Sequence, residues 1–324
     1  MNELAVCLTY LYYVDEQSAE YMPITYTIYS ESGGIHKTTW TANLAEAHAR
    51  QGFDVLVIDL DHQAANLTYL FDVEEGRDDP DADNLVRHVL GRPDGDFEDL
   101  IRSTEEGVDV LPAHNMLEEF TELLLQRERF EENMGDEFNR YEQLYNVLWE
   151  ENDVQDDYDV VIIDPNARAE IMLYNAIYAT RTLVAPSKPA GKGNKSLEGL
   201  AGLLESMSEN LSIDVGVAAV ILSGAGTTST HTRYIEEMED EYGIAATIGE
   251  RQSMMDEMWD AQGTAFKVVE DGWHNGEPGS RRLREREVET LETILGIANY
   301  LTDEFGVEPP QEPSLNIEDT EVVS

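Results

Sequence analysis

The stretch Ser30–Thr39, with the sequence SESGGIHKTT, contains residue types that bind phosphate groups. Gly33 and Gly34 have no Cβ, so the backbone there can turn tightly and approach an anion. The N–H groups of such a loop and of the following helix start converge on phosphate. Lys37 would neutralise the β- and γ-phosphates, and the Thr38 hydroxyl would complete the shell of Mg²⁺. The stretch therefore predicts a loop for a Mg²⁺-bound nucleotide.

The spacing of this loop departs from the usual phosphate-binding pattern G-x-x-x-x-G-K-[ST]. Glu31 and His36 occupy its two glycine positions. On spacing alone, a glycine turn capped by a threonine-rich helix start explains the stretch equally well. A glycine at the position of His36 often adopts a backbone conformation that costs other residues about 1–2 kcal/mol. The imidazole would either contact phosphate or crowd the loop. Whether the stretch is a phosphate-binding loop or a glycine turn therefore has to be inferred from the rest of the chain.

The elements around the loop alternate between strands and helices. Residues 24–29 form an apolar, β-rich run and residues 37–50 a helical pattern, while Asp54–Asp59 and Tyr158–Asp164 are continuous apolar runs with an acidic end, typical of buried parallel strands. Further strands are predicted at 108–111, 181–186, 215–222 and 245–248, and further helical segments at 84–104, 115–150, 169–179, 195–209, 230–242 and 283–305. This alternation predicts an α/β fold with a mostly parallel, twisted sheet and helices on both faces.

Three polar segments directly follow predicted strands: residues 31–39, 59–66 and 164–168. Ligands in parallel sheets bind outside the carboxyl ends of the strands. Because all three segments fall at strand ends, the pattern favours a binding site over an ordinary turn.

The composition is extremely acidic for a chain that still has 41% hydrophobic residues. The 324 residues include 67 Asp and Glu against 21 Lys and Arg, which gives a formal net charge of −46. The apolar segments are periodic and spread along the chain, so we expect a folded protein with an acidic shell rather than disorder. In about 1 M salt the self-repulsion is screened within ~3 Å, so the surface suits a salt-adapted organism. The alternative is an ordinary acidic protein that is strained by its own charge at low salt.

Cys7 is the single cysteine, which excludes a disulfide framework, a metal site made of a cysteine cluster and a cysteine-ligated iron–sulfur centre within one chain. No run of about 20 apolar residues is present to span a membrane. The apolar stretch Ala5–Val14 is short and lacks both a basic region and a cleavage site, which argues against a signal peptide. We therefore expect a cytoplasmic location.

The chain divides into three parts. Residues 22–306 are expected to form a nucleotide-binding domain with a helical insertion at about 84–150. Residues 1–21 precede the first strand, and either Met22 is the true start or these residues form an extra strand or arm. Residues 307–324 are rich in proline and acids and are expected to be a disordered tail.

Several of these segments together resemble the ParA/MinD group of P-loop ATPases, and most closely its Soj-like ParA branch. The resemblance runs from about Ile24 to Leu301 and implies a P-loop NTPase-like fold. The family loop K-G-G-V-G-K-T-T matches Ser32, Gly33, Gly34, Ile35, His36, Lys37, Thr38 and Thr39. The motif D-x-D-P-Q-G-N-x-T matches Asp59–Thr68, with His62 in place of proline and one extra alanine.

Three later stretches also match the family. The strand motif I-I-D-x-P matches Ile162–Pro165, although here proline directly follows Asp164. The stretch Ala185–Leu200 is similar to the next strand and helix of the family, and Gly249–Gly263, with Arg251 and Glu257, is similar to the loop beside the nucleotide base. Five motifs in the family order specify the fold better than any one of them does.

The resemblance implies an ATPase that uses ATP and Mg²⁺ as cofactors, forms an ATP-dependent homodimer and takes part in DNA partitioning or positioning. In the phosphate loop, the resemblance implies that Gly33–Thr39 cradle the phosphates, that Lys37 supports catalysis and that Thr38 binds Mg²⁺. Among the aspartates, it implies that Asp164 holds a Mg²⁺-bound water, that Asp61 orients the attacking water and that Asp59 supports Asp61 near the metal. It also implies that Arg251 lies beside the base. The alternatives for the three aspartates are a solvated strand end for Asp59 and Asp164 and a helix cap for Asp61.

One departure from the family concerns a signature lysine, which in the family reaches across the dimer to the phosphates of the partner and is replaced here by Ser32. Its loss would slow hydrolysis, weaken the dimer or be compensated by another cation. Candidates near the predicted strand ends are Lys188, Lys192, Lys195 and Arg168, for which solvated surface cations are the alternative.

The resemblance also implies nonspecific DNA and a ParB-like or other adaptor protein as partners. The candidate DNA contacts are the basic residues before the closing helix, Arg281, Arg282, Arg284 and Arg286. Glu285 and Glu287 lie among them, so an internally paired, solvated helix is the alternative. Electrostatic DNA binding weakens steeply with salt, which counts against it in a salt-rich cell.

Three other functions compete with this one. A MinD-like membrane positioner needs a basic amphipathic C-terminal helix, whereas the sequence ends in LNIEDTEVVS. An iron–sulfur carrier needs paired cysteines. A degenerate, weakly hydrolysing or non-hydrolysing scaffold that acts through protein contacts stays open because of Ser32 and His36.

Overall fold

The structure is a computed structural model. It describes residues 23–31, 35–63, 66–166, 168, 170–226, 228–249, 251–279 and 284–317. Three of the phosphate-loop residues, Ser32, Gly33 and Gly34, lie outside the described residues, as do Arg281 and Arg282 of the basic cluster.

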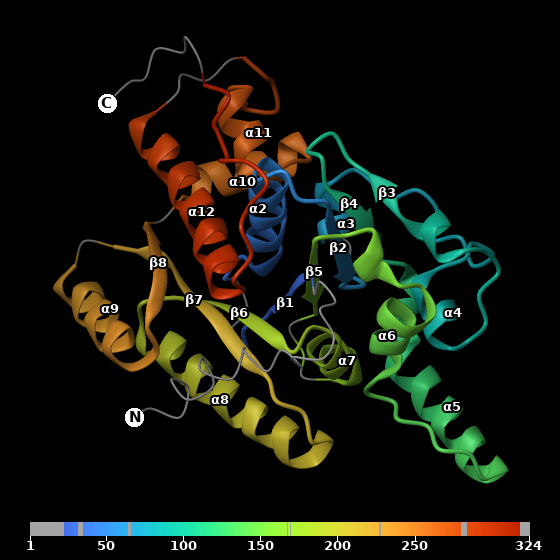
Figure 1. The fold of residues 1–324 in the computed structure, drawn as a ribbon. Helices are drawn as coiled ribbons and strands as arrows, with labels where there is room; N and C mark the ends of the chain where they lie inside the picture. The colour runs from blue at the N-terminus through green and yellow to red at the C-terminus, as the bar shows by residue number, and fades with distance from the viewer. Residues whose placement is uncertain are drawn as a thin grey trace.

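A single twisted sheet runs through the described part of the chain (Figure 1). Its eight strands lie in the order β3-β4-β2-β5-β1-β6-β7-β8. All neighbouring strands are parallel except β3 and β4. The strands are β1 (Ile24–Ile28), β2 (Val55–Leu60), β3 (Arg102–Ser103), β4 (Asp109–Leu111), β5 (Val160–Pro165), β6 (Thr182–Ser187), β7 (Gly216–Ala225) and β8 (Ile244–Gly249). This topology confirms the predicted α/β fold.

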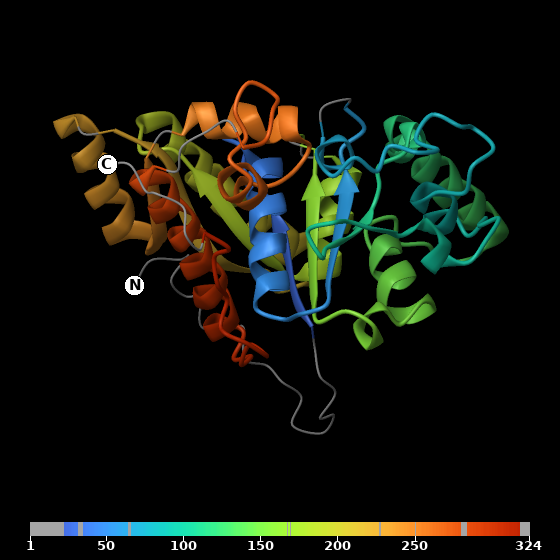
Figure 2. The same cartoon turned by 90° about the horizontal axis from the view of Figure 1, so that it is seen from above.

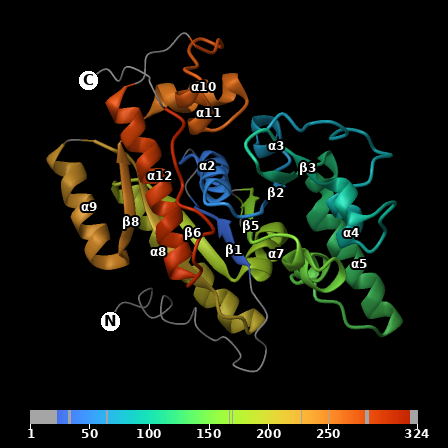
Figure 3. The same ribbon diagram turned by 45° about the horizontal axis from the view of Figure 1, so that its top comes forward.

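Helices cover both faces of the sheet. One face packs against α2 (Lys37–Arg50), α10 (Gln252–Ala261), α11 (Ala265–Glu270) and α12 (Glu285–Glu304). Figure 3 shows α10 and α11 beside α12 on this face. The other face packs against α5 (Phe120–Met134), α6 (Gln143–Tyr145), α7 (Ile171–Thr180), α8 (Gly191–Leu211) and α9 (Ser229–Tyr242). Alternating strand residues point to opposite faces, so Val55 and Val57 join the first core while Leu56 and Ile58 join the second.

The segment between β2 and β5 is more broken than the sequence predicted. It contains α3 (Leu67–Leu70), α4 (Leu85–Val89), the short helices η1 (Phe97–Leu100) and η2 (Asn115–Glu119), then α5, α6, the π-helical turn η3 (Asn146–Glu151) and η4 (Val154–Asp156). The expected helical segment 84–104 ends early because Gly91 takes a φ of 63° after α4. Gly135, with a φ of 90°, likewise ends α5.

Two segments near the C-terminus differ from expectation. The stretch 249–263, expected to be a loop, forms the helix α10 over most of its length. Residues 307–317, expected to belong to a disordered tail, contact the body of the protein: the Gln311 N–H donates to the Gln51 carbonyl (2.9 Å), and Leu315 and Ile317 pack against the core. Apolar side chains on either side of the prolines, Val307, Leu315 and Ile317, explain this contact.

Candidate nucleotide-binding site

The strands β1, β2 and β5 are parallel neighbours, so their carboxyl ends meet at one edge of the sheet. Figure 2 shows the arrowheads of β2 and β5 side by side at this edge. Asp59 on β2 and Asp164 on β5 are register partners, so their side chains leave neighbouring strands side by side. Both carboxyl groups are buried. The structure thus brings together two of the acids that the sequence placed at strand ends.

Asp59 is held by hydrogen bonds from its own loop. One carboxylate oxygen accepts the Asp61 N–H (3.0 Å), and the other accepts the Thr68 N–H (2.8 Å) and the Thr68 hydroxyl (2.6 Å). Burial raises the pKa of Asp59 to about 7, and the neighbouring charge of Asp164 adds to the rise, while these hydrogen bonds lower it. Asp59 therefore organises the loop that follows β2.

Asp164 is different, because neither of its buried carboxylate oxygens has a hydrogen-bond partner of regular geometry among the described residues. Burial raises the pKa of Asp164 to about 6, opposed by the positive charge of Lys37 and by the nearby hydroxyls of Thr38 and Thr41. Buried polar atoms are rarely left without partners. A carboxylate beside a threonine hydroxyl matches the oxygen ligands that Mg²⁺ prefers, so the residues present fit this ion.

The start of α2 supplies the cationic side of the site. His36 precedes the helix with φ 60° and ψ 41°, the left-handed conformation that favours glycine. Its carbonyl accepts the Trp40 N–H (2.9 Å), so the helix begins despite the strain. Ile35 is buried below the loop, and Lys37 and Thr38 are half-buried beside Asp164. Burial and the charge of Lys188 lower the pKa of His36, and Asp256 opposes them.

Thr39, in contrast, faces the core rather than the predicted phosphate position. Its side chain is buried, and its carbonyl accepts the Asn43 amide N–H (2.7 Å). Asn43 in turn accepts the Ala265 N–H (2.8 Å), which ties the first turns of α2 to α11.

Asp61 lies in the loop after β2 and is not fully buried. Its carboxylate accepts the Gln63 N–H (3.0 Å) and, at 3.4 Å, an amide N–H of Asn166 from the loop after β5. The Asn66 side chain donates to the Asp61 carbonyl (2.5 Å). The position of Asp61 is thus fixed from both neighbouring strands.

Arg77 belongs to the same loop, although nothing in the sequence pattern marked it. Its guanidinium donates to the carbonyls of His62 (2.9 Å) and Gln63 (2.5 Å) and to the Asn66 side chain (3.2 Å). It comes from an acidic surface segment without periodicity, and such a segment gives no signal that one arginine will point inward.

Arg251, predicted to lie beside the base, precedes α10, and its guanidinium donates to the Thr290 hydroxyl of α12 (2.8 Å). All four candidate replacement cations are exposed, and the charge of one of them, Lys188, lowers the pKa of His36. Arg168 lies 3.9 Å from Glu170.

The described part of the basic cluster consists of Arg284 and Arg286, and one of the two is paired with an acid. Arg284 lies 3.8 Å from the buried Glu287, and Arg286 is exposed on the first turn of α12. Among the described residues no helix is long and apolar enough to cross a membrane.

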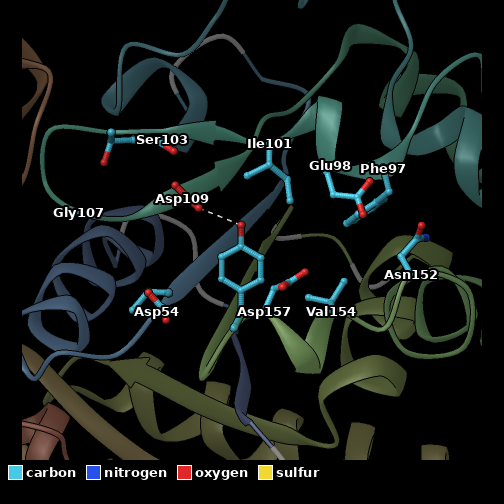
Figure 4. Close-up of a pocket in the computed structure, with 13 residues that line it drawn as sticks. Asp54, Phe97, Glu98, Ile101, Ser103, Gly107, Asp109, Asn152, Val154 and Asp157 are labelled. Carbon is cyan, nitrogen blue, oxygen red and sulfur yellow. Dashed lines mark hydrogen bonds between the residues drawn. The ribbon is translucent and has the colours of Figure 1, made fainter.

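A cavity of about 530 Å³ lies at the opposite edge of the sheet, around the amino ends of β2, β4 and β5 (Figure 4). Asp54, Asp109 and Asp157 line it, and the Tyr158 hydroxyl donates to Asp109 (2.9 Å). Its acidic lining would repel phosphate, so the Asp59–Asp164 edge is the better candidate for a nucleotide.

Comparison with known proteins gives a family match and several relatives. A family model described as an AAA domain matches residues 24–215, more than half of the chain. The sporulation initiation inhibitor protein Soj of Bacillus subtilis is 28% identical over 217 residues, 65% of this chain and 77% of Soj. An uncharacterized ATP-binding protein of Methanocaldococcus jannaschii is 36% identical over 141 residues, 44% of each chain. A second protein of that archaeon is 26% identical over 57% of this chain and 66% of its own length, so the chain spans less than two thirds of either archaeal relative.

Among solved structures, a plasmid partition protein of Borrelia burgdorferi bound to AMPPNP superimposes with a TM-score of 0.60 and 21% identity. The superposition covers 85% of this chain and 97% of that one, which shows a shared fold. The family match, these relatives and the sheet with its paired aspartates together show that the chain belongs to the ParA/MinD-type P-loop ATPases.

Proposed function

We propose that this protein is a slow ATPase that binds Mg·ATP, forms a nucleotide-dependent dimer and takes part in partitioning or positioning DNA. The observation that carries the proposal is the buried Asp164 carboxylate, which lacks regular hydrogen-bond partners and lies beside the start of α2, next to Lys37 and Thr38. The likeness to Soj and to a plasmid partition protein supports the DNA role.

The residues of this chain would divide the work as follows. Lys37 and the N–H groups at the start of α2 bind and orient the phosphates. Thr38 and Asp164 would hold Mg²⁺, which neutralises charge on the phosphates when bound. Asp61, fixed through Asn166 and the N–H of Gln63, orients a water for attack, and Asp59 keeps its loop in place.

The dimer, the DNA contact and the adaptor protein belong to the proposal as well. Arg284 and Arg286 mark the start of α12 as the candidate DNA contact, although Arg284 also pairs with Glu287. We propose that the protein works in the cytoplasm, where a ParB-like or other adaptor would stimulate its hydrolysis.

A second candidate function is a nucleotide-binding scaffold that does not hydrolyse ATP. It is favoured by His36, whose left-handed backbone forces a bulky, half-buried side chain into a loop where glycine fits best.

The acidic surface suggests adaptation to a salt-rich cytoplasm. With a net charge of −46, the folded chain is stabilised when salt screens self-repulsion. The free energy of unfolding is expected to rise with KCl up to molar concentration and to respond much less to sucrose, which carries no charge.

ATP turnover and dimer mass, measured with and without duplex DNA, test the proposal. We expect slow turnover that DNA accelerates, and a dimer only with a non-hydrolysable ATP analogue. Arg286→Gln should weaken the DNA effect, while the exposed Arg129→Gln on α5 serves as the matched control. Tight ATP binding without turnover would instead establish the scaffold.

A further inference from the structure

The stretch from the end of β6 into the first turns of α8 is positively charged, although the chain as a whole is strongly acidic. The chain has five lysines in all, and three of them, Lys188, Lys192 and Lys195, fall within eight residues of each other. No acidic residue occurs between Thr182 and Leu197. In a chain with a net charge of −46, this stretch without acidic residues departs strongly from the overall composition.

The three lysines are not neutralised by the fold. Lys267, outside this segment, pairs with Glu105 (3.7 Å) and Glu106 (3.5 Å). Lys188, Lys192 and Lys195 are exposed, and no acidic side chain lies within ion-pair distance of them in the described ranges. Their charge is therefore available to a ligand.

The backbone adds donors at the same place. The helix α8 is 21 residues long, and Ala190 precedes it without a side-chain hydrogen bond at the cap. The first N–H groups of a helix have no partner within the helix, and they carry the positive end of its dipole. This arrangement binds anions in many proteins.

Ser187 gives independent support for a ligand at this helix end. Its side chain is completely buried, and its hydroxyl has no hydrogen-bond partner among the described residues. The hydroxyl points at the first turn of α8, since a Cβ on Gly193 would lie 2.8 Å from it and 2.0 Å from the Lys188 carbonyl. Glycine is required at 193, because the Lys188 carbonyl and the Ser187 hydroxyl approach the first turn of α8 too closely for any Cβ. The Tyr234 hydroxyl of α9 reaches the same turn, 3.1 Å from where a Cβ on Gly191 would lie.

The segment lies beside the predicted nucleotide loop. The Ser30 and Ser196 hydroxyls are 3.2 Å apart, and the Glu31 carboxylate packs against Gly199 of α8. The Tyr29 N–H donates to the Val184 carbonyl (3.1 Å), so the ends of β1 and β6 run together. A ligand at the start of α8 would therefore lie near Ser30, Glu31 and His36.

We propose that Ser187, Lys188, Lys192, Lys195 and the first turn of α8 form a second phosphate-binding site, separate from the loop that contains Lys37. The site takes a phosphate group, either free phosphate or pyrophosphate or the terminal phosphate of a nucleotide.

The full-length Lys37→Ala variant isolates this site from the first one. Calorimetric titration of that variant with pyrophosphate in KCl buffer is expected to show one binding site per chain. In the Lys37→Ala background, Lys192→Gln and Ser187→Ala should each weaken binding about tenfold, as expected for the loss of one hydrogen bond to a charged group. Arg129→Gln, the same kind of change on an exposed helix elsewhere, should leave binding unchanged. Thermal unfolding of each variant verifies that the fold is retained.

Titrations with ATP on the Lys37-containing chain separate the two sources of phosphate. If ATP binding weakens about tenfold in Lys192→Gln, the site takes a nucleotide phosphate; if only pyrophosphate binding weakens, it takes free phosphate. The proposal is overturned if the Lys37→Ala variant binds no pyrophosphate, if Lys192→Gln and Ser187→Ala bind it normally, or if duplex DNA is the ligand that these variants lose. Pyrophosphate binding without any ATP binding would contradict only the ATPase proposal.

Discussion

Asp59 and Asp164 are register partners on neighbouring parallel strands, yet of the two only Asp59 accepts hydrogen bonds of regular geometry from the described residues. Two buried carboxylates side by side repel each other, and the one without such hydrogen bonds gains most from a cation. This difference indicates that Asp59 stabilises the loop after β2, whereas the Asp164 carboxylate can accept a metal ion.

Replacing each aspartate with asparagine is expected to change stability by different amounts. Without Mg²⁺ at neutral pH, Asp164→Asn should raise the free energy of unfolding by about 2 kcal/mol, because it removes a buried charge whose pKa is already raised. Asp59→Asn also removes a buried charge with a raised pKa, but an amide cannot accept all three hydrogen bonds, and their loss, about 1–3 kcal/mol, should offset the gain. Chemical denaturation measures both, and equal stabilisation by the two variants would contradict the assignment.

The conformation of His36 gives a second prediction. With a φ of 60°, any residue with a Cβ is strained there, so His36→Gly should be about 1 kcal/mol more stable than His36→Ala. Both variants lose the imidazole, so the difference between their free energies of unfolding measures the cost of the left-handed backbone conformation. Urea denaturation provides the measurement, and equal midpoints for the two variants would show that the left-handed conformation is not present in solution.

Arg50 at the end of α2 connects three distant segments. Its guanidinium donates to Glu46 (2.8 Å) and, through two nitrogens, to Glu270 (2.8 Å each), and it also reaches the Ser314 carbonyl (3.0 Å). Arg50→Ala leaves the buried Glu46 and the partly buried Glu270 without their cation and should cost about 3 kcal/mol of stability.

The same substitution should release the C-terminal segment. Faster hydrogen exchange is expected at the amide of Asn316, which donates to Glu270 (2.8 Å). Arg50→Lys keeps the charge without the planar fork and should lie between wild type and Arg50→Ala. Unchanged exchange in Arg50→Ala would mean that residues 307–317 do not depend on this contact.

Residues 307–317 and the central strands differ in how far their structure can be predicted from the sequence. The buried strands around Asp59 and Asp164 were predictable, because a continuous apolar run that ends in an acid has few other structural explanations. The C-terminal segment was not, because its proline and acid content outweighs Leu315 and Ile317, whose contacts exist only once the core is assembled.

The candidate site likewise contains residues that the sequence motifs indicated and residues that they did not. Sequence motifs indicated His36, Asp61 and Asp164 as candidate site residues. They did not indicate Arg77, whose side chain binds the His62 and Gln63 carbonyls only because the chain turns back over this loop. The helix α10 had a readable signal in the spacing of Met254, Met258 and Ala261, which repeats every three or four residues. The expectation of a loop beside the base outweighed that signal.

His48 should give the protein a measurable pH dependence. It is completely buried, with one ring nitrogen 2.8 Å from the Gln51 side-chain oxygen and the other 3.1 Å from the Tyr26 hydroxyl, and burial lowers its pKa to about 4. An unfolded histidine titrates near 6.5, so between these values only the unfolded state takes up the proton. The stabilising contribution is therefore present above about pH 6.5 and is lost as the pH falls towards 4.

Comparison with His48→Gln removes the contributions of all other groups. The stability difference between wild type and this variant should shrink by about 3 kcal/mol as the pH falls from 6.5 to 4. Denaturation curves at matched salt give the difference, and a constant value across this range would show that His48 is not buried in its neutral form.

Binding of Mg·ATP in molar KCl, followed by turnover, tests the central proposal most directly. We expect the wild-type protein to bind ATP only with Mg²⁺ and to hydrolyse it slowly, Lys37→Ala to lose binding, and Arg129→Gln to behave as wild type. No ATP binding by the wild-type protein, or equal binding by Lys37→Ala, would contradict the assignment of the Asp164 edge as a nucleotide site.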